Sequence, residues 1–249
     1  MPEAVALVTG ASRGIGRALA ESLVGDGWRV AALARDADAL ADLAARSPQG
    51  RVLPLIADVT DGPAMAQAAA ALAALWRCPD LVVANAGVLR AVGPTWQLDP
   101  DLWWADLDVN VRGVLQTLHV TLPAMVQRGS GRVVLVSSGM GRAPAPWTSA
   151  YGASKAAVSH LASSLALELA GTGVSVFAIS PGMVRTDMTD WPDALLAHRP
   201  DLAALPPHAY LPARVAAALV ADLASGRFDA LSGRFIHVRD DREAMLAPA

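Results

Sequence analysis

Short apolar runs rich in β-branched residues alternate with helix-like segments along almost the whole chain. The runs, which we predict to be strands, are 5–9, 29–34, 51–57, 80–84, 132–137, 174–179 and 234–238. Helical patterns lie between them, at 14–25, 37–46, 63–76, 101–128, 151–170 and 212–225. Alternation with short links is typical of right-handed βαβ units. Because several runs are apolar throughout, we expect an α/β fold: one doubly wound, seven-stranded parallel sheet with helices on both faces.

Composition excludes several classes of protein. Apolar residues make up 53% of the 249 residues and charged residues 17%, which excludes a disordered chain. The balance of 20 basic against 23 acidic residues, with no basic run, argues against binding to nucleic acid or a membrane surface. No signal peptide or membrane-spanning segment is evident, so a cytoplasmic protein is expected. The single cysteine, Cys78, and the five histidines show no metal-ligand spacing, so no metal is expected.

No repeat or linker divides the chain, so residues 1–249 are expected to form a single domain. One long segment, 187–211, contains four prolines and shows no strand pattern. A loop of that length is usually functional or mobile, and we assign it to the substrate site. Residues 241–249 are expected to form a mobile tail or a piece of an interface.

A glycine-rich turn follows the first strand and precedes the first helix. It contains Gly10, Gly14 and Gly16. Glycines allow a tight turn and close approach of the backbone to a pyrophosphate, which the helix N-terminus then attracts. The same residues match the Gly-x-Ser-x-Gly pattern of a hydrolase with Ser12 as nucleophile, but that site needs a loop preceding the serine, and only one strand precedes it. The turn therefore predicts nucleotide binding.

Tyr151 and Lys155 lie four residues apart at the start of a predicted helix, and thus on one helix face. A free phenol has a pKa of about 10, and a neighbouring cation favours its ionised form. Lys155 is the only lysine, and Asn85 and Asn110 are the only asparagines. The pairing predicts a phenol that acts as general acid and base, with Lys155 lowering its pKa.

These motifs together resemble the short-chain dehydrogenase/reductase family. The resemblance rests on the glycine turn, Asn85-Ala-Gly87, Asn110, Ser138, Tyr151-x-x-x-Lys155 and Pro181-Gly182, which occur in the family's order from about residue 4 to 240. It implies a Rossmann-type domain that transfers hydride between a nicotinamide cofactor and a carbonyl or alcohol. The implied catalytic residues are Ser138, Tyr151, Lys155 and Asn110. Strand alternation favours Ser138 over Ser137 as the residue facing the cleft.

The resemblance also implies the cofactor-binding residues. These are Gly10, Ser12, Arg13, Gly14, Ile15, Gly16, Arg35, Asp58, Val59, Asn85, Ala86, Gly87, Tyr151, Lys155, Pro181, Gly182, Val184 and Thr186. The acid that would select NAD is replaced by Ala34, while the guanidiniums of Arg13 and Arg35 suit a 2′-phosphate. Asp36 is either a helix N-cap or a ribose ligand. We expect NADP(H).

Proximity in sequence to the catalytic groups predicts an apolar substrate pocket. Its candidate residues are Leu89, Met140, Trp147, Met183, Met188 and Trp191, for which packing in the core is the alternative. We expect a carbonyl reductase acting on a small molecule, assembled as a homodimer or homotetramer through the 101–128 and 151–170 helices, as family members commonly are. The alternative is a non-catalytic, NADP-binding regulatory protein on the same fold.

Overall fold

Seven strands form a single parallel sheet in the computed structural model, which describes residues 3–191 and 193–247. The strand order is β3-β2-β1-β4-β5-β6-β7. The bounds are β1 Val5–Thr9, β2 Arg29–Ala34, β3 Val52–Ile56, β4 Leu81–Ala84, β5 Gly131–Val136, β6 Val174–Ser180 and β7 Phe235–His237. The chain order reverses between β1 and β4, and in such sheets this switch point is where a ligand binds. The doubly wound α/β fold expected from the sequence is confirmed.

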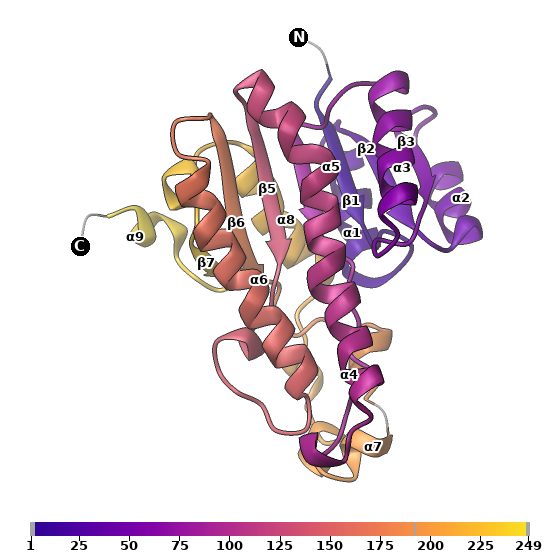
Figure 1. Ribbon diagram of the computed structural model, residues 1–249, viewed down its shortest axis with the longest axis vertical. Helices are drawn as coiled ribbons and strands as arrows, with labels where there is room; N and C mark the ends of the chain where they lie inside the picture. Colours follow the sequence, from indigo (N-terminus) through magenta and orange to yellow (C-terminus); the bar gives the residue numbers. More distant parts are fainter. Residues whose placement is uncertain (1–2, 192, 248–249) are drawn as a thin grey trace.

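Helices cover both faces of the sheet and enclose two hydrophobic cores (Figure 1). One core is shared with α1 (Gly14–Gly25), α2 (Ala37–Arg46) and α8 (Ala213–Ala224). The other is shared with α3 (Gly62–Leu75), α5 (Gly113–Arg128) and α6 (Ser149–Glu168). The central strands are buried on both sides, which is why their sequences are apolar throughout.

Most predicted elements agree with the structure, their ends differing by at most two residues. The exception is the helix expected over 101–128. It consists of α4 (Pro100–Leu107), a π-helical turn (Asp108–Arg112) and α5. A π-turn inserts one extra residue into the helical repeat and often marks a functional site. Asn110 lies within this turn and is buried.

The C-terminal segment differs from the tail expected over 241–249. Asp241 caps a short helix, α9 (Arg242–Leu246), through its carboxylate. Met245 and Leu246 pack against the first core, and Arg242 forms an ion pair with Asp222 of α8. The segment is therefore docked through residue 247, and residues 248–249 lie outside the described residues.

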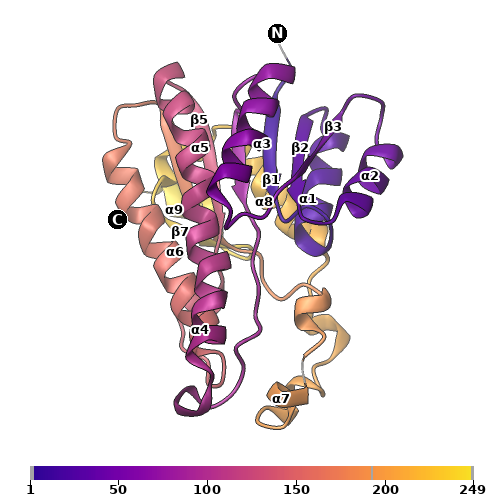
Figure 2. The ribbon, with the colours of Figure 1, turned by 45° about the vertical axis from the view of Figure 1, so that its right-hand side comes forward.

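Residues 187–211, which we call the arm, extend beyond the carboxyl ends of the strands (Figure 2). The arm contains α7 (Asp193–Leu196) and several 3₁₀ turns. Its base is closed, because Val184 and Leu211 form a β-bridge and Leu211 N–H donates to the Met183 carbonyl at 2.7 Å. Within the described residues, no helix is both long and apolar enough to cross a membrane.

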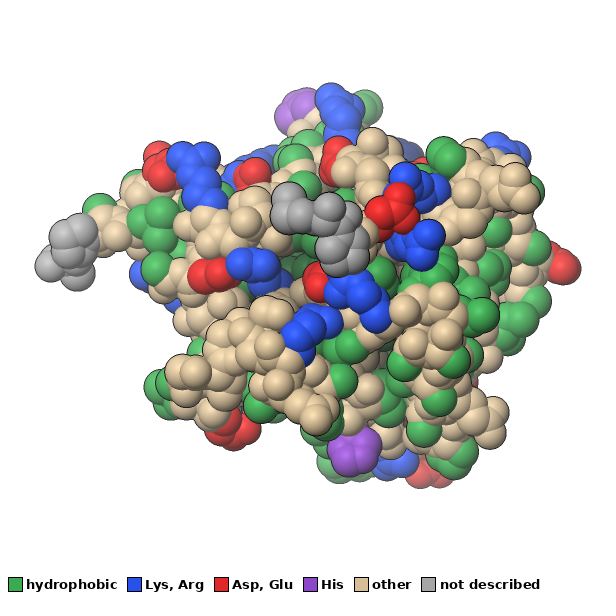
Figure 3. All heavy atoms as spheres, turned by 90° about the horizontal axis from the view of Figure 1, so that it is seen from above, with side chains coloured by type: hydrophobic (Ala, Val, Ile, Leu, Met, Phe, Trp, Pro, Cys, Tyr) green, Lys and Arg blue, Asp and Glu red, His purple; other side chains and the backbone are tan. Residues whose placement is uncertain are grey.

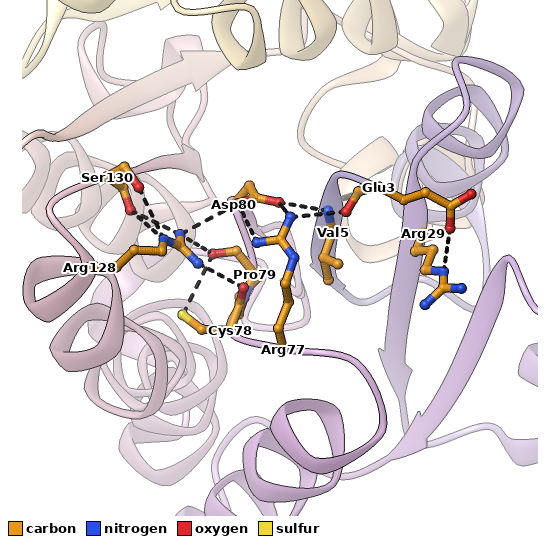
Figure 4. Close-up of polar contacts among 9 residues, drawn as sticks. All are labelled: Glu3, Val5, Arg29, Arg77, Cys78, Pro79, Asp80, Arg128 and Ser130. Atoms are coloured by element: carbon orange, nitrogen blue, oxygen red, sulfur yellow. Dashed lines mark hydrogen bonds and ion pairs between the residues drawn. The ribbon is translucent and has the colours of Figure 1, made fainter. Parts of the chain in front are cut away.

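A charged network lies at the opposite end of the sheet, where the strands begin. Arginine side chains gather near the middle of this face beside acidic ones (Figure 3). The Asp80 carboxylate accepts from the Val5 backbone N–H at 2.8 Å and from the Arg77 guanidinium (Figure 4). Arg128 donates to the carbonyls of Cys78 and Pro79 at 2.9 and 2.8 Å. The network fastens the amino ends of β1 and β4 to the end of α5.

We predict that Asp80→Ala lowers the free energy of unfolding by about 2 kcal/mol, because it leaves the Val5 N–H without its acceptor and removes the carboxylate partner of Arg77. Urea denaturation, read as a shift in midpoint at unchanged slope, measures the effect. Asp201→Ala is the matched control, since its pair with Arg199 lies on the exposed arm and is expected to contribute less than about 1 kcal/mol. Equal shifts for the two variants would contradict the prediction.

Candidate functional site

Backbone crowding at the end of β1 explains the three glycines of the turn. Gly10 and Gly14 have φ of +67° and +55°, in the left-handed region that favours glycine. A Cβ on Gly16 would lie 2.2 Å from the Gly10 carbonyl oxygen, and one on Gly10 would lie 2.9 Å from the Ala86 Cα. Larger residues would push α1 and the β4 loop away from the turn.

Thr9 and Asn85 join the turn to the end of β4. The Thr9 hydroxyl accepts from the backbone N–H groups of Asn85 and Ala86 at 3.0 and 3.1 Å. The Asn85 amide donates back to the Thr9 carbonyl at 2.9 Å. Asn85 thus holds the two loops of the switch point together. Sequence reasoning missed Thr9, although its place directly before Gly10 was a usable signal.

The N-terminus of α1 is left open towards the cleft. Arg13 occupies the N-cap position, and none of the described side chains caps this helix end. Its first N–H groups and the positive end of the helix dipole are therefore free for an anion, which fits a cofactor pyrophosphate. Ser12 and Ile15 belong to the same turn. The Arg13 guanidinium meets the Asp187 carboxylate of the arm at 2.7 Å.

Asp36, just after the end of β2, has the N-cap role that was one of its two expected roles. Its carboxylate accepts from the Ala39 N–H at 3.0 Å, so it caps α2. Arg35 is exposed, and its guanidinium lies 3.4 Å from the Asp58 carboxylate at the end of β3. The Val59 side chain is buried against Gly113, so only its backbone is available to a cofactor.

Ser137 and Ser138 at the end of β5 have opposite surroundings. The Ser137 hydroxyl is buried and donates to the Lys155 carbonyl at 2.8 Å, which fastens the strand to α6. Ser138 is half-buried, and its hydroxyl acts on the phenol of Tyr151, whose pKa it lowers. The structure therefore brings Ser138, rather than Ser137, to the tyrosine, as strand alternation predicts.

Tyr151 and Lys155 lie side by side on the first turns of α6. The Lys155 ammonium is 5.5 Å from the centre of the Tyr151 ring and donates to the Val136 carbonyl at 2.8 Å. Burial lowers the pKa of Lys155 from 10.5 to about 8. Burial also raises the pKa of the Tyr151 phenol, an effect that Ser138 opposes. The direction is opposite to the lowered phenol pKa expected from the sequence, because desolvation outweighs the effect of Ser138.

Asn110 is fully buried in the π-helical turn. Its amide oxygen accepts from the Val88 N–H at 2.8 Å, and its nitrogen donates to the Val88 carbonyl and the Ser154 hydroxyl at 2.9 and 3.0 Å. These bonds connect the loop after β4 to α6. The side chain therefore positions both elements. Gly87 fits between Asn110 and Lys155, since a Cβ there would lie 3.2 and 3.4 Å from their polar atoms.

Asp106, on α4, is a second support that sequence reasoning missed. Its fully buried carboxylate accepts from the backbone N–H groups of Arg90 and Ala91 at 2.8 and 3.0 Å, and from the Arg90 guanidinium at 2.8 Å. The carboxylate fixes the far end of the loop that carries Asn85–Leu89. Nothing in the local sequence pattern distinguishes it from the acids on the exposed helix faces.

The Pro181-Gly182 loop after β6 packs closely on the base of the arm. Gly182 has φ of +73°, and a Cβ there would lie 2.7 Å from Leu211. Val184 is buried in the bridge to Leu211, and the Thr186 N–H donates to the Thr189 hydroxyl at 2.9 Å. Thr186 also faces the glycine turn, 3.1 Å from where a Gly14 Cβ would be. The loop thus lies against the predicted cofactor cradle.

The predicted pocket side chains are all half-buried, and none belongs to either hydrophobic core. They come from three loops at the carboxyl edge of the sheet: Leu89 after β4, Met140 and Trp147 before α6, and Met183, Met188 and Trp191 after β6. This favours a lining role over core packing. Residues 3–191 and 193–247 contain no cluster of three or more His, Cys, Asp or Glu that could hold a metal.

Comparison with known proteins identifies the family. The family model described as short chain dehydrogenase matches residues 4–193. A short chain dehydrogenase of Pseudocercospora fijiensis (strain CIRAD86) is 35% identical over 98% of this chain and 82% of its own length. Among solved structures, the KRED1-Pglu enzyme superposes with a TM-score of 0.83 at 36% identity, covering 93% of this chain and 99% of its own. A variant of actinorhodin polyketide ketoreductase with NADPH gives 0.85 at 29% identity, covering 96% and 97%. The chain therefore belongs to the short-chain dehydrogenase/reductase family, whose members are NAD(P)-dependent oxidoreductases.

Proposed function

We propose that this protein is an NADP(H)-dependent carbonyl reductase that transfers hydride reversibly between NADPH and a ketone or aldehyde. The observation that carries the proposal is the convergence of Ser138, Tyr151 and Lys155 beside Gly87 in the loop after β4. A hydroxyl, a phenol and an ammonium in that order can hold a carbonyl oxygen, protonate it and stabilise the resulting phenolate.

Each residue has a distinct task in reduction. When bound, the reduced nicotinamide supplies the hydride. Ser138 holds the substrate oxygen, and Tyr151 donates its proton to that oxygen. Because burial keeps the phenol protonated, the residue is in the form that reduction requires. Lys155 favours the phenolate that remains and binds the nicotinamide ribose, while Asn110 supports the proton relay by positioning α6.

The preference for NADP(H) follows from the end of β2. Asp36 caps α2, and Ala34 offers no acceptor for a ribose hydroxyl. Arg13 and Arg35 are exposed guanidiniums, each paired with a single exposed or half-exposed carboxylate. Such pairs contribute about 0–1 kcal/mol, so a dianionic 2′-phosphate can displace the carboxylates. The ketoreductase with NADPH among the similar structures supports this choice.

A non-catalytic, NADP-binding regulator is the alternative function. A sensor of this kind would need the cofactor cradle but neither the pairing of Ser138 with Tyr151 nor the buried Lys155. Absorbance decay of NADPH with a panel of ketones, aldehydes and quinones separates the two functions. Binding of NADPH without turnover across the panel would favour the regulator.

We further propose that α5 and α6 pair with the same helices of a second copy. Between them lies an apolar groove of about 380 Å³, lined by Leu115, Leu118, His119, Leu122, Pro123, Val126, Leu161 and Leu165. Leu115 is 56% exposed and Val126 39%, and Trp104, on α4, is 60% exposed. An exposed apolar strip continuing from one helix to the next is typical of an interface between copies.

Tyr151→Phe tests the proton donor. We expect kcat to fall by about a hundredfold or more, because a general acid contributes that much, while the Kd for NADPH stays within about twofold. Tyr210→Phe is the matched control, since it removes the only other phenol but keeps the ring beneath Arg185. Full activity in the Tyr151 variant would exclude the assignment.

The cofactor preference is tested by Arg35→Ala. We expect kcat/KM for NADPH to fall by about tenfold and that for NADH to stay unchanged, because a charge-assisted hydrogen bond contributes about 1.5–3 kcal/mol. Arg46→Ala, on the exposed side of α2, is the control. A wild-type enzyme that uses NADH as well as NADPH would refute the preference itself.

The pH profile tests the role of Lys155. Its pKa of about 8 means that the ammonium loses its proton as the pH rises through 8. We expect kcat/KM for carbonyl reduction to decline above about pH 8, since kcat/KM reports the groups of the free enzyme. Tyr151, whose pKa is raised, stays protonated over this range. A profile that is flat up to pH 10 would remove Lys155 from the proposed mechanism.

Light scattering in solution tests the proposed interface. We expect the wild-type mass to be a multiple of the chain mass, and Leu115→Glu to shift it towards one chain by placing a charge in the apolar groove. Leu75→Glu, at another exposed leucine on α3, is the control and should leave the mass unchanged. A monomeric wild type would reject the interface.

A further inference from the structure

Trp147 has a strained backbone. Among the described residues it is the one non-glycine with positive φ, at +69°. A bulky side chain in this region costs about 1–3 kcal/mol, and such residues persist only where their surroundings hold them. Here the Trp147 carbonyl accepts from the Gly93 N–H at 2.9 Å, and the next residue, Thr148, is buried at the N-cap of α6. These contacts hold Trp147 in its strained conformation, four residues before Tyr151 in the chain.

The Trp147 ring has an aromatic partner from the arm. The imidazole of His198 stacks on it with ring centres 4.5 Å apart and an angle of 24° between the planes. The backbone N–H of His198 donates to the Leu195 carbonyl at 3.0 Å, and Leu195 is itself anchored by its buried side chain. The sequence gives no sign of this role, because His198 lies in an irregular segment 51 positions after Trp147.

The stack joins two walls of the predicted pocket. Met140 and Trp147 stand on the loop before α6, whereas Met188 and Trp191 stand on the arm. The arm is closed at its base by the Val184–Leu211 bridge and projects beyond the sheet edge (Figure 2). The stack of His198 on Trp147 is a second contact, besides the bridge at the base, that links the arm to another part of the chain.

We propose that His198 is a positioning residue for substrate, acting through its stack on Trp147 to hold the arm over the pocket. This rests on the proposed carbonyl reduction at Tyr151. The stack sets the separation of the two apolar walls and thus the affinity for the substrate body. It leaves the reacting groups untouched, because His198 contacts Trp147 rather than Ser138, Tyr151 or Lys155.

The test compares His198→Ala, which removes the stack, with His198→Phe, which retains an aromatic ring. His208→Ala, an exposed histidine on the same arm, is the matched control. For the ketone that the wild type reduces fastest, we expect His198→Ala to raise KM about fivefold, the effect of losing one aromatic pair, without lowering kcat. His198→Phe should restore KM, and KM for NADPH should stay unchanged in all three variants.

Hydrogen exchange of residues 193–205 provides a second readout that does not require turnover. We expect faster exchange in His198→Ala than in the wild type, His198→Phe or His208→Ala. The proposal would be overturned if KM for the ketone were unchanged in His198→Ala, or if it rose equally in His198→Ala and His198→Phe. If the wild type reduces no carbonyl compound, the proposed function fails. Hydrogen exchange still tests the stack in that case, because unchanged exchange in His198→Ala would show that the stack does not hold the arm.

Discussion

The buried ammonium of Lys155 is the interaction around which the site is arranged. A charge removed from water must be hydrogen-bonded, and here the carbonyl of Val136 on β5 is its acceptor. That bond requires α6 to lie close to the strand. Gly141 allows the approach, since a Cβ there would lie 2.6 Å from the Lys155 carbonyl carbon. Ser137 then secures it from the strand side. The position of Tyr151, one turn earlier, follows from this contact.

Much of this arrangement could be predicted from the sequence because it depends on local pattern. The apolar runs define the strands, and strand alternation separates Ser138 from Ser137. The capping preference of aspartate makes an N-cap one of the two roles expected for Asp36, and the glycine spacing places the turn at the end of β1. In each case the determining residues are close together in the chain, so the pattern and the structure depend on the same few neighbours.

The remaining features depend on contacts between distant segments. Asn110, in the π-turn, hydrogen-bonds to Val88 and Ser154, and no helical periodicity in the sequence reports those contacts. The pKa of the Tyr151 phenol is raised by burial, and a sequence motif does not report how deeply a residue is buried. Arg13 and Asp187 are separated by 174 positions, and their pairing requires the completed sheet. A sequence motif thus identifies the groups of the site more readily than the surroundings that tune them.

The closed base of the arm has a consequence for how this architecture can vary. The arm leaves the carboxyl end of the sheet and returns to it at adjacent positions, which the Val184–Leu211 bridge joins. Insertions or deletions between those points leave strand register undisturbed, and lengthening a loop costs only about 0.6 kcal/mol per doubling. New ligand preferences can therefore arise in evolution by replacement of the arm alone, while the sheet and the residues at its carboxyl end are inherited unchanged.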